Sequence, residues 1–275
     1  MDWITHYGCY YVVHGDDITS DSDGDDCYRF VKEAGRFRVV KRTPGISTTD
    51  LVGRMLLCTR GHFIKSFLAY LAGKEGSGTP EELAQTGKES FQRVKDYASD
   101  ESGLRPGADV WVWVGTQPSI AAQTEGRQPG RFDRLVQGKG ARPGQRIVYV
   151  DGGFDLFSSG HIEFLRQVHA VEEERGIQSG WYAPERINSR MRDHGEDYGP
   201  VYVIAGVHDD EVINYWKGLN YPIMNIFERG LCVLQCRVSR FIDKRRMSSL
   251  FPAHHPLTAR IVHSCSSLLC AFHTH

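Results

Sequence analysis

The sequence predicts an α/β protein with a parallel sheet, and three observations carry that prediction. Residues 8–60 and 145–238 each combine short apolar runs, typical of buried parallel strands, with helical spacing of apolar residues. In the second stretch a strand, a helix and a strand follow in order, as in βαβ units. Residues 61–144 between them are rich in Gly, Pro, Ser and charge. We therefore expect two α/β segments joined by a long linker.

The first segment is expected to open on a buried parallel strand at 10–13 and to end on a packed helix at 51–57. His14, Asp16 and Asp17 follow the strand, and open α/β sheets place ligand-contacting groups at that end. The two carboxylates could hold a cationic substrate or Mg²⁺. Alternatively, they belong to a solvated loop, because four more aspartates follow at 21–26.

Hydroxyl groups crowd the start of the helix at 51–57. Residues 42–50 read RTPGISTTD. The first backbone N–H groups of a helix lack partners and its dipole is positive there, so these hydroxyls and amides, with Arg42, could receive a phosphate. The alternative is an ordinary Ser/Thr helix cap preceded by a turn.

The second segment gives the stronger α/β signal. We expect a strand at 146–150, a helix from about 160 to 171 and a strand at 201–207. Residues 172–199 are polar, and we expect them to form a surface insertion, because a structureless connection of this length is unusual inside a compact unit.

The loop between the first strand and the helix of this segment is rich in glycine. Residues 151–161 read DGGFDLFSSGH. The paired glycines let the backbone approach a ligand, and His161 lies at the expected helix N-terminus, where phosphate oxygens are stabilised. The chain contains neither G-x-G-x-x-G nor G-x-x-x-x-G-K-[ST], so the sequence does not support a dinucleotide oxidoreductase or a P-loop NTPase.

Composition narrows the class of protein. Lys+Arg 33 against Asp+Glu 34 gives a formal net charge of -1, which offers no broad basic surface for nucleic acid. The apolar runs are too short to span a bilayer and no secretory signal is visible, so we expect a cytoplasmic protein. The seven cysteines are interpreted as free thiols because they form no paired C-x-x-C spacing.

Some helix is expected at 80–97, and a poorly ordered, His-rich tail is expected from 239.

Several motifs together resemble the cytidylyltransferases that activate phosphocholine and phosphoethanolamine, with an order and spacing closest to the phosphoethanolamine branch. Residues 14–19, HGDDIT, resemble a strand end of that family, and 42–50 resemble its RTxGxST signature. In the second segment, 154–161 resembles the stretch that ends in the HxGH motif. Further matches to later elements of the family lie at 208–210, 217–218 and 225–229.

The resemblance implies a Rossmann-like nucleotidyltransferase sheet and an enzyme of phospholipid biosynthesis, which forms CDP-ethanolamine and pyrophosphate from CTP and phosphoethanolamine. It implies that Mg²⁺ enters with CTP, that the protein itself forms no metal site, and that a homodimer is an open option. His161 and Lys217 would be catalytic and stabilise phosphate charge, whereas Asp155, His14 and Asp16 would bind the acceptor. The residues implied in CTP binding are Arg42, Thr43, Gly45, Ser47, Thr48, Thr49, Gly153 and Phe154.

The same resemblance implies a division of the chain. Residues 1–60 would be the rear half of a first cytidylyltransferase domain, 61–144 a linker with some helix, 145–238 the front half of a second domain, and 239–275 an atypical tail. Neither active site would then be complete, and Ser158 stands where HxGH has its first histidine. Three hypotheses follow: an impaired cytidylyltransferase, a non-catalytic nucleotide-binding or dimerisation module, or one permuted sheet that places His161 near Ser47–Thr49.

Overall fold

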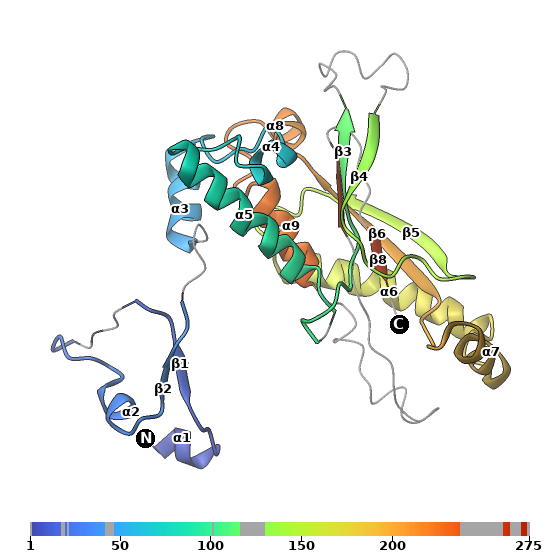
Figure 1. The fold of residues 1–275 in the computed structure, drawn as a ribbon, viewed down its shortest axis with the longest axis horizontal. Coiled ribbons are helices and arrows are strands. Elements are labelled where there is room, and N and C mark those ends of the chain that lie inside the picture. Colours follow the sequence, from blue (N-terminus) through green and yellow to red (C-terminus); the bar gives the residue numbers. More distant parts are fainter. Residues whose placement is uncertain are drawn as a thin grey trace. The chain divides into compact units, whose positions relative to one another are not determined.

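A computed structural model describes residues 2–17, 20, 22–41, 47–100, 102–115 and 130–236, together with the backbone of 261–264 and 271–273. The chain divides into two compact units, Met1–Asp50 and Leu51–His275 (Figure 1). The assignment of the chain to halves of two cytidylyltransferase domains stays a prediction.

The first unit contains α1 (Asp2–His6) and one small parallel βαβ arrangement. Strands β1 (Val12–His14) and β2 (Phe37–Val39) pair in parallel, with Val12 opposite Phe37, and α2 (Arg29–Glu33) connects them. A strand is therefore present close to 10–13, but the prediction that it is buried was wrong, because Val13 is 57% exposed. Two short strands and one short helix provide too little apolar surface to cover it.

Helix α3 (Thr48–Leu57) begins three residues before the predicted helix, within the run of hydroxyl residues. Its buried side chain is Arg54, whereas Leu56 is 78% and Leu57 74% exposed. The helix is present, but the prediction that its apolar residues pack was wrong. The buried guanidinium of Arg54 anchors α3, and Leu56 and Leu57 stay exposed.

Residues 61–144 carry more regular structure than the expected linker with some helix. The predicted helix at 80–97 is confirmed as α5 (Pro80–Tyr97), which Thr79 and Glu82 cap reciprocally through hydrogen bonds of 3.3 and 2.9 Å. Helix α4 (Phe67–Leu71) precedes it, and β3 (Val110–Gly115) and β4 (Gly130–Val136) form an antiparallel pair after it. Val110 and Val112 of β3 are buried in the main core, so this segment packs against the sheet although its overall composition resembles that of a linker.

The main sheet adds β5 (Arg146–Gly152), β6 (Val201–His208) and β7 (Ile261–Ser264) to the pair β3 and β4, and its strand order is β4-β3-β7-β6-β5. Strands β5 (Arg146–Gly152) and β6 (Val201–His208) confirm the two strands predicted for the second segment, and they pair in parallel with Arg146 opposite Val201. The backbone of the tail supplies β7 (Ile261–Ser264), parallel to β3 and β6, and β8 (Ala271–His273), antiparallel to β6. The sequence predicts neither of these two strands, and the rest of the tail from 239 lies outside the described residues.

Two helices occupy most of the region expected to be a surface insertion. Helix α6 (Ser159–Gln178) runs seven residues beyond the predicted end at 171, and α7 (Pro184–His194) follows it. Glu172 is buried and accepts hydrogen bonds from Arg146 (2.7 Å) and Arg175 (2.6 Å), so a residue predicted to start the insertion belongs to the packed helix. The continuation of α6 beyond 171 was mistaken for a loop because its residues are mostly polar, and the ion pair that joins it to β5 is formed by the buried Glu172 and the largely exposed Arg146.

Helices α8 (Asp210–Lys217) and α9 (Ile226–Gln235) complete the second unit, and α9 packs beside α5 and against β6 (Figure 1). The valines of β6 are fully buried, as expected for a parallel strand covered on both faces. The predicted α/β fold with a parallel sheet is thus confirmed. Because β1 and β2 form a sheet of their own, the described strands do not form the single permuted sheet considered above. Within the described ranges, no helix combines the length and the apolar character needed to cross a bilayer.

Candidate active site

The candidate site lies at the carboxyl ends of β5 and β6, the edge at which open α/β sheets bind ligands. The loop after β5 turns sharply into α6, and Phe154 and Leu156 adopt positive φ angles of 49° and 47°. Non-glycine residues in this region carry backbone strain, which concentrates at functional sites. Phe154 is held there by burial against the rings of Phe157 and His161, with centroid distances of 6.4 and 5.8 Å.

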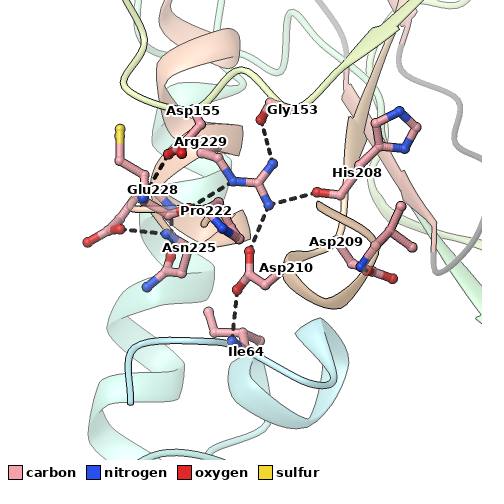
Figure 2. Close-up of polar contacts among 12 residues, drawn as sticks. Ile64, Gly153, Asp155, His208, Asp209, Asp210, Pro222, Asn225, Glu228 and Arg229 are labelled. Carbon is pink, nitrogen blue, oxygen red and sulfur yellow. Dashed lines mark hydrogen bonds and ion pairs between the residues drawn. The ribbon is translucent and has the colours of Figure 1, made fainter. Parts of the chain in front are cut away.

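A buried arginine ties the loops of this edge together. Arg229 of α9 is fully buried and donates hydrogen bonds to the carbonyl oxygens of Gly153 (2.6 Å) and His208 (2.7 Å), which follow β5 and end β6 (Figure 2). It also donates to the carbonyl of Met224 (2.9 Å) and to the carboxylate of Asp210 (2.7 Å). Burial raises the pKa of Asp210 to about 6, although Arg229 opposes that rise.

The carboxylate of Asp155 is fixed by two backbone amides. Its Oδ2 accepts from the N–H of Ile223 (2.9 Å) and its Oδ1 from the N–H of Met224 (2.8 Å). The segment before α9 therefore orients Asp155. A carboxylate that accepts one hydrogen bond on each oxygen still has lone pairs for a cation.

His161 stands in the first turn of α6, stacked on Phe157 at a centroid distance of 5.3 Å. Its Nδ1 accepts a hydrogen bond of 3.1 Å from the backbone N–H of Ser158. Burial lowers the pKa of His161, and the positive charge of Lys217 lowers it further, against the opposing effect of Asp155. The imidazole is therefore neutral at pH 7, and because Nδ1 is an acceptor its proton sits on Nε2.

These electrostatic effects show that three predicted residues are brought together. Lys217 ends α8 and reaches the surroundings of His161 from the second loop of the edge, with its Nζ 5.6 Å from the ring centroid of Tyr221. Asp155 acts on the same imidazole as a negative neighbour and raises its pKa. A neutral N–H donor, an ammonium group and an oriented carboxylate are thus electrostatic neighbours, a combination that suits a ligand carrying both phosphate and a cation.

Comparison with known proteins identifies the relatives of this chain. None of the protein-family models matches it. It is 35% identical over 239 residues to the ethanolamine-phosphate cytidylyltransferase of Mus musculus and 34% identical over 236 residues to that of Dictyostelium discoideum; each match covers 86% of this chain and 49% of the relative. The choline-phosphate cytidylyltransferase A of Rattus norvegicus is 36% identical over 55 residues, 20% of this chain and 15% of the relative. The chain is homologous to the ethanolamine-phosphate cytidylyltransferases.

The predicted resemblance to the ethanolamine-phosphate cytidylyltransferases is thereby confirmed. The chain spans about half the length of the curated relatives that it matches. The long ethanolamine-phosphate match, against the short choline-phosphate match, agrees with the branch that the motif order favours.

The other residues predicted from this family lie in different parts of the chain. Gly153 and Phe154 belong to the strained loop of the second unit, beside His161. His14 and Asp16 lie at the end of β1 in the first unit, where the Nδ1 of His14 is 3.2 Å from the carbonyl of Gly15. Thr48 and Thr49 begin α3 and Ser47 directly precedes it, whereas Arg42, Thr43 and Gly45 lie outside the described residues. The roles of all these residues stay predictions.

Sequence reasoning missed the structural importance of the charges in α9. It noted Glu228 and Arg229 as family matches and assigned them no role. The signal was present, because these two charges interrupt a helix whose other residues from 226 to 234 are mostly apolar. Charged residues on a buried helix are rare unless they are paired, so their partners are expected in the surrounding loops.

Proposed function

We propose that this chain acts as a CTP:phosphoethanolamine cytidylyltransferase, forming CDP-ethanolamine and pyrophosphate. The observation that carries the proposal is the convergence of His161, Lys217 and Asp155 at the carboxyl edge of the parallel sheet. Homology to the ethanolamine-phosphate enzymes supports it. In this reaction a phosphate oxygen of phosphoethanolamine attacks the α-phosphorus of CTP. The bond from that phosphorus to the bridging oxygen breaks, and pyrophosphate leaves with the electron pair.

The side chains act by positioning and charge neutralisation, which is what such a transfer requires. The Nε2–H of His161 donates to a phosphate oxygen, and the ammonium of Lys217 neutralises the charge that develops on the phosphates. Asp155 attracts the ammonium of the acceptor. In the second unit, Gly153 and Phe154 are proposed to lie beside the nucleotide. In the first unit, Arg42, Thr43, Gly45 and the hydroxyls at 47–49 are proposed to bind CTP phosphates, and His14 and Asp16 to bind an acceptor.

Mg²⁺ is proposed to arrive bound to the CTP phosphates, as part of the substrate. Among the described residues no three His, Cys, Asp or Glu side chains gather as a metal site. Mg²⁺ that bridges phosphates keeps several waters and needs one or two carboxylates of the protein, so this donor set suits a substrate-borne ion. Removing Mg²⁺ with a chelator is expected to abolish turnover, and adding it back to restore turnover.

The proposal is tested with the purified chain, CTP and phosphoethanolamine, by measuring pyrophosphate release and CDP-ethanolamine. His161→Ala and Lys217→Ala are each expected to lower kcat by roughly 10²–10³. The matched controls are His6→Ala in α1 and Lys88→Ala in α5, two exposed residues, which are expected to leave kcat unchanged. No release of pyrophosphate by the unmodified chain would contradict the proposal.

A second function is favoured by one observation, the serine at the first position of the HxGH-like stretch. With Ser158 the site has one positioned imidazole where the family motif has two. The chain would then bind CTP without turnover, as a nucleotide-binding or dimerisation module. A thermal shift with CTP, combined with no pyrophosphate release, would favour this function over catalysis.

We also propose a cytoplasmic location and self-association. The described cysteines are free thiols, which suits a reducing compartment. Within the described residues β5 pairs with β6 alone, and it exposes Ile147 and Tyr149, so its free edge could pair with a second copy. Cell fractionation tests the location, and loss of a dimer in Tyr149→Lys, measured by analytical ultracentrifugation, tests the association.

A further inference from the structure

A buried ion pair joins α3 to α9. The guanidinium of Arg54 donates from Nη1 to Oε2 of Glu228 (2.8 Å) and from Nη2 to Oε1 (3.0 Å), which is a two-pronged, planar contact. Both side chains are less than a tenth exposed. Neither partner belongs to the group of His161, Lys217 and Asp155.

The same guanidinium reaches the segment that orients Asp155. Nη1 of Arg54 also donates to the carbonyl oxygen of Ile223 (2.9 Å). The N–H of Ile223 in turn donates to Asp155, and the next amide, that of Met224, donates to the other oxygen of the same carboxylate. One residue, Ile223, thus connects Arg54 to Asp155 through its two backbone polar groups.

Two further contacts hold this segment from the side of α3. The side-chain amide of Asn220 donates to the carbonyl oxygen of Arg54 (2.6 Å), and Nε2 of His62 lies 2.8 Å from the carbonyl oxygen of Pro222. Glu228 fixes the other end, because its Oε2 also accepts from the N–H of Asn225 (2.8 Å) (Figure 2). Residues 220–225 are therefore clamped, and Asp155 binds to the middle of the clamped segment.

We propose that Arg54 is a positioning residue for the acceptor: together with Glu228 it holds the amides of Ile223 and Met224 where they orient the carboxylate of Asp155. The inference rests on the proposed function, in which Asp155 binds the ammonium of phosphoethanolamine. Arg54 lies in the stretch predicted to serve a different cytidylyltransferase domain. The contact with Glu228 instead makes it part of the site formed by the second segment.

The first test separates acceptor binding from turnover. Arg54→Ala is expected to raise KM for phosphoethanolamine about tenfold while kcat and KM for CTP change less than about twofold, since ground-state binding of one substrate is what is lost. Arg54→Lys keeps the charge but cannot make the two-pronged contact, so it is expected to shift KM in the same direction. If Arg54→Ala left KM for phosphoethanolamine unchanged, or raised both KM values equally, the proposal would be overturned.

A matched control distinguishes positioning from general loss of a buried ion pair. Arg190 of α7 and Asp197 form an ion pair of similar burial, in which Arg190 also donates to the carbonyl oxygen of Trp181 and lies over the rings of Trp181 and Tyr198. Arg190→Ala is expected to lower stability without changing KM for phosphoethanolamine. The double variant Arg54→Leu, Glu228→Leu removes both charges, which often preserves folding, and it is expected to show the same KM defect.

The second test does not depend on catalysis. Amide hydrogen exchange is expected to be faster at Ile223 and Met224 in Arg54→Ala, and unchanged there in Arg190→Ala. Unchanged protection of both amides in a folded Arg54→Ala would contradict the positioning role. If the unmodified chain made no CDP-ethanolamine, the proposed function would fail by itself, and exchange together with calorimetric binding of phosphoethanolamine would still decide the role of Arg54.

Discussion

The backbone N–H of Ser158 donates a 3.1 Å hydrogen bond to Nδ1 of His161. Because the donor is a backbone group, it survives any substitution of that side chain apart from proline. It fixes the imidazole with Nδ1 as acceptor, so that Nε2 carries the proton and becomes the donor of the site. The serine therefore preserves the orientation of His161 but adds no second imidazole.

Ser158→His is expected to raise kcat by roughly 10²–10³, because it restores one positioned donor to the transferring phosphate while the amide of residue 158 still holds His161. The measurement is pyrophosphate release at saturating CTP and phosphoethanolamine. Ser159→His, one residue further along α6, places an imidazole on an exposed position and should leave kcat unchanged. An equal rate in both variants would show that Ser158 does not limit turnover.

Arg229→Met is expected to destabilise the second unit by about 3–5 kcal/mol, because it leaves the buried carboxylate of Asp210 without its charged partner. The free energy of unfolding from urea denaturation measures the loss. Combining it with Asp210→Asn should recover part of the stability, since the uncompensated charge is gone. A double variant as unstable as the sum of the single ones would argue against the pairing.

Lowering the pH from about 7 to 4 is expected to destabilise the second unit through His169. This side chain is buried in α6, and burial lowers its pKa to about 4, below the value of the unfolded chain. The unfolded state therefore binds the proton first, so stability is complete above pH 6.5 and is lost as the pH falls toward 4, by about 3 kcal/mol.

Urea denaturation of His169→Gln against the unmodified chain, at several pH values, isolates this contribution. The difference in free energy of unfolding between the two proteins should depend on pH between 4 and 6.5. A difference that stays constant over this range would contradict the buried, neutral state of His169.

Gly176→Ala is expected to cost about 1–3 kcal/mol by overpacking. A Cβ at Gly176 of α6 would lie 2.5 Å from Cγ of Pro200, which directly precedes β6 and whose ring cannot move aside easily. Gly160→Ala, in the same helix, would find only the Ser158 Oγ at 3.8 Å and should be neutral or stabilising by up to about 1 kcal/mol. Thermal denaturation of both variants makes the comparison, and equal melting temperatures would refute the close contact.

The predictable part of the fold is the part with strong local signals. The strands β5 and β6 and helix α5 were predicted near their observed limits, because the sequence signals that mark them lie within each element. The burial of β1 was overestimated, and β3 and β4 were missed inside a stretch that composition made look like linker. In both cases the number and apolarity of the packing partners decided the outcome, and these partners are distant in the sequence.

The sequence by itself indicated the resemblance to the ethanolamine-phosphate cytidylyltransferases and the candidate site residues, since His161, Lys217 and Asp155 stand in the motifs that carry that resemblance. Only the tertiary structure decided which charged side chains are buried and which groups they bind. Arg229 binds two loops at the sheet edge. Arg54 pairs with Glu228, which lies 174 residues further along the chain. The physical reason is that a guanidinium is tolerated in a core only where carbonyl and carboxylate oxygens converge on it. Folding alone brings such oxygens together from separate loops.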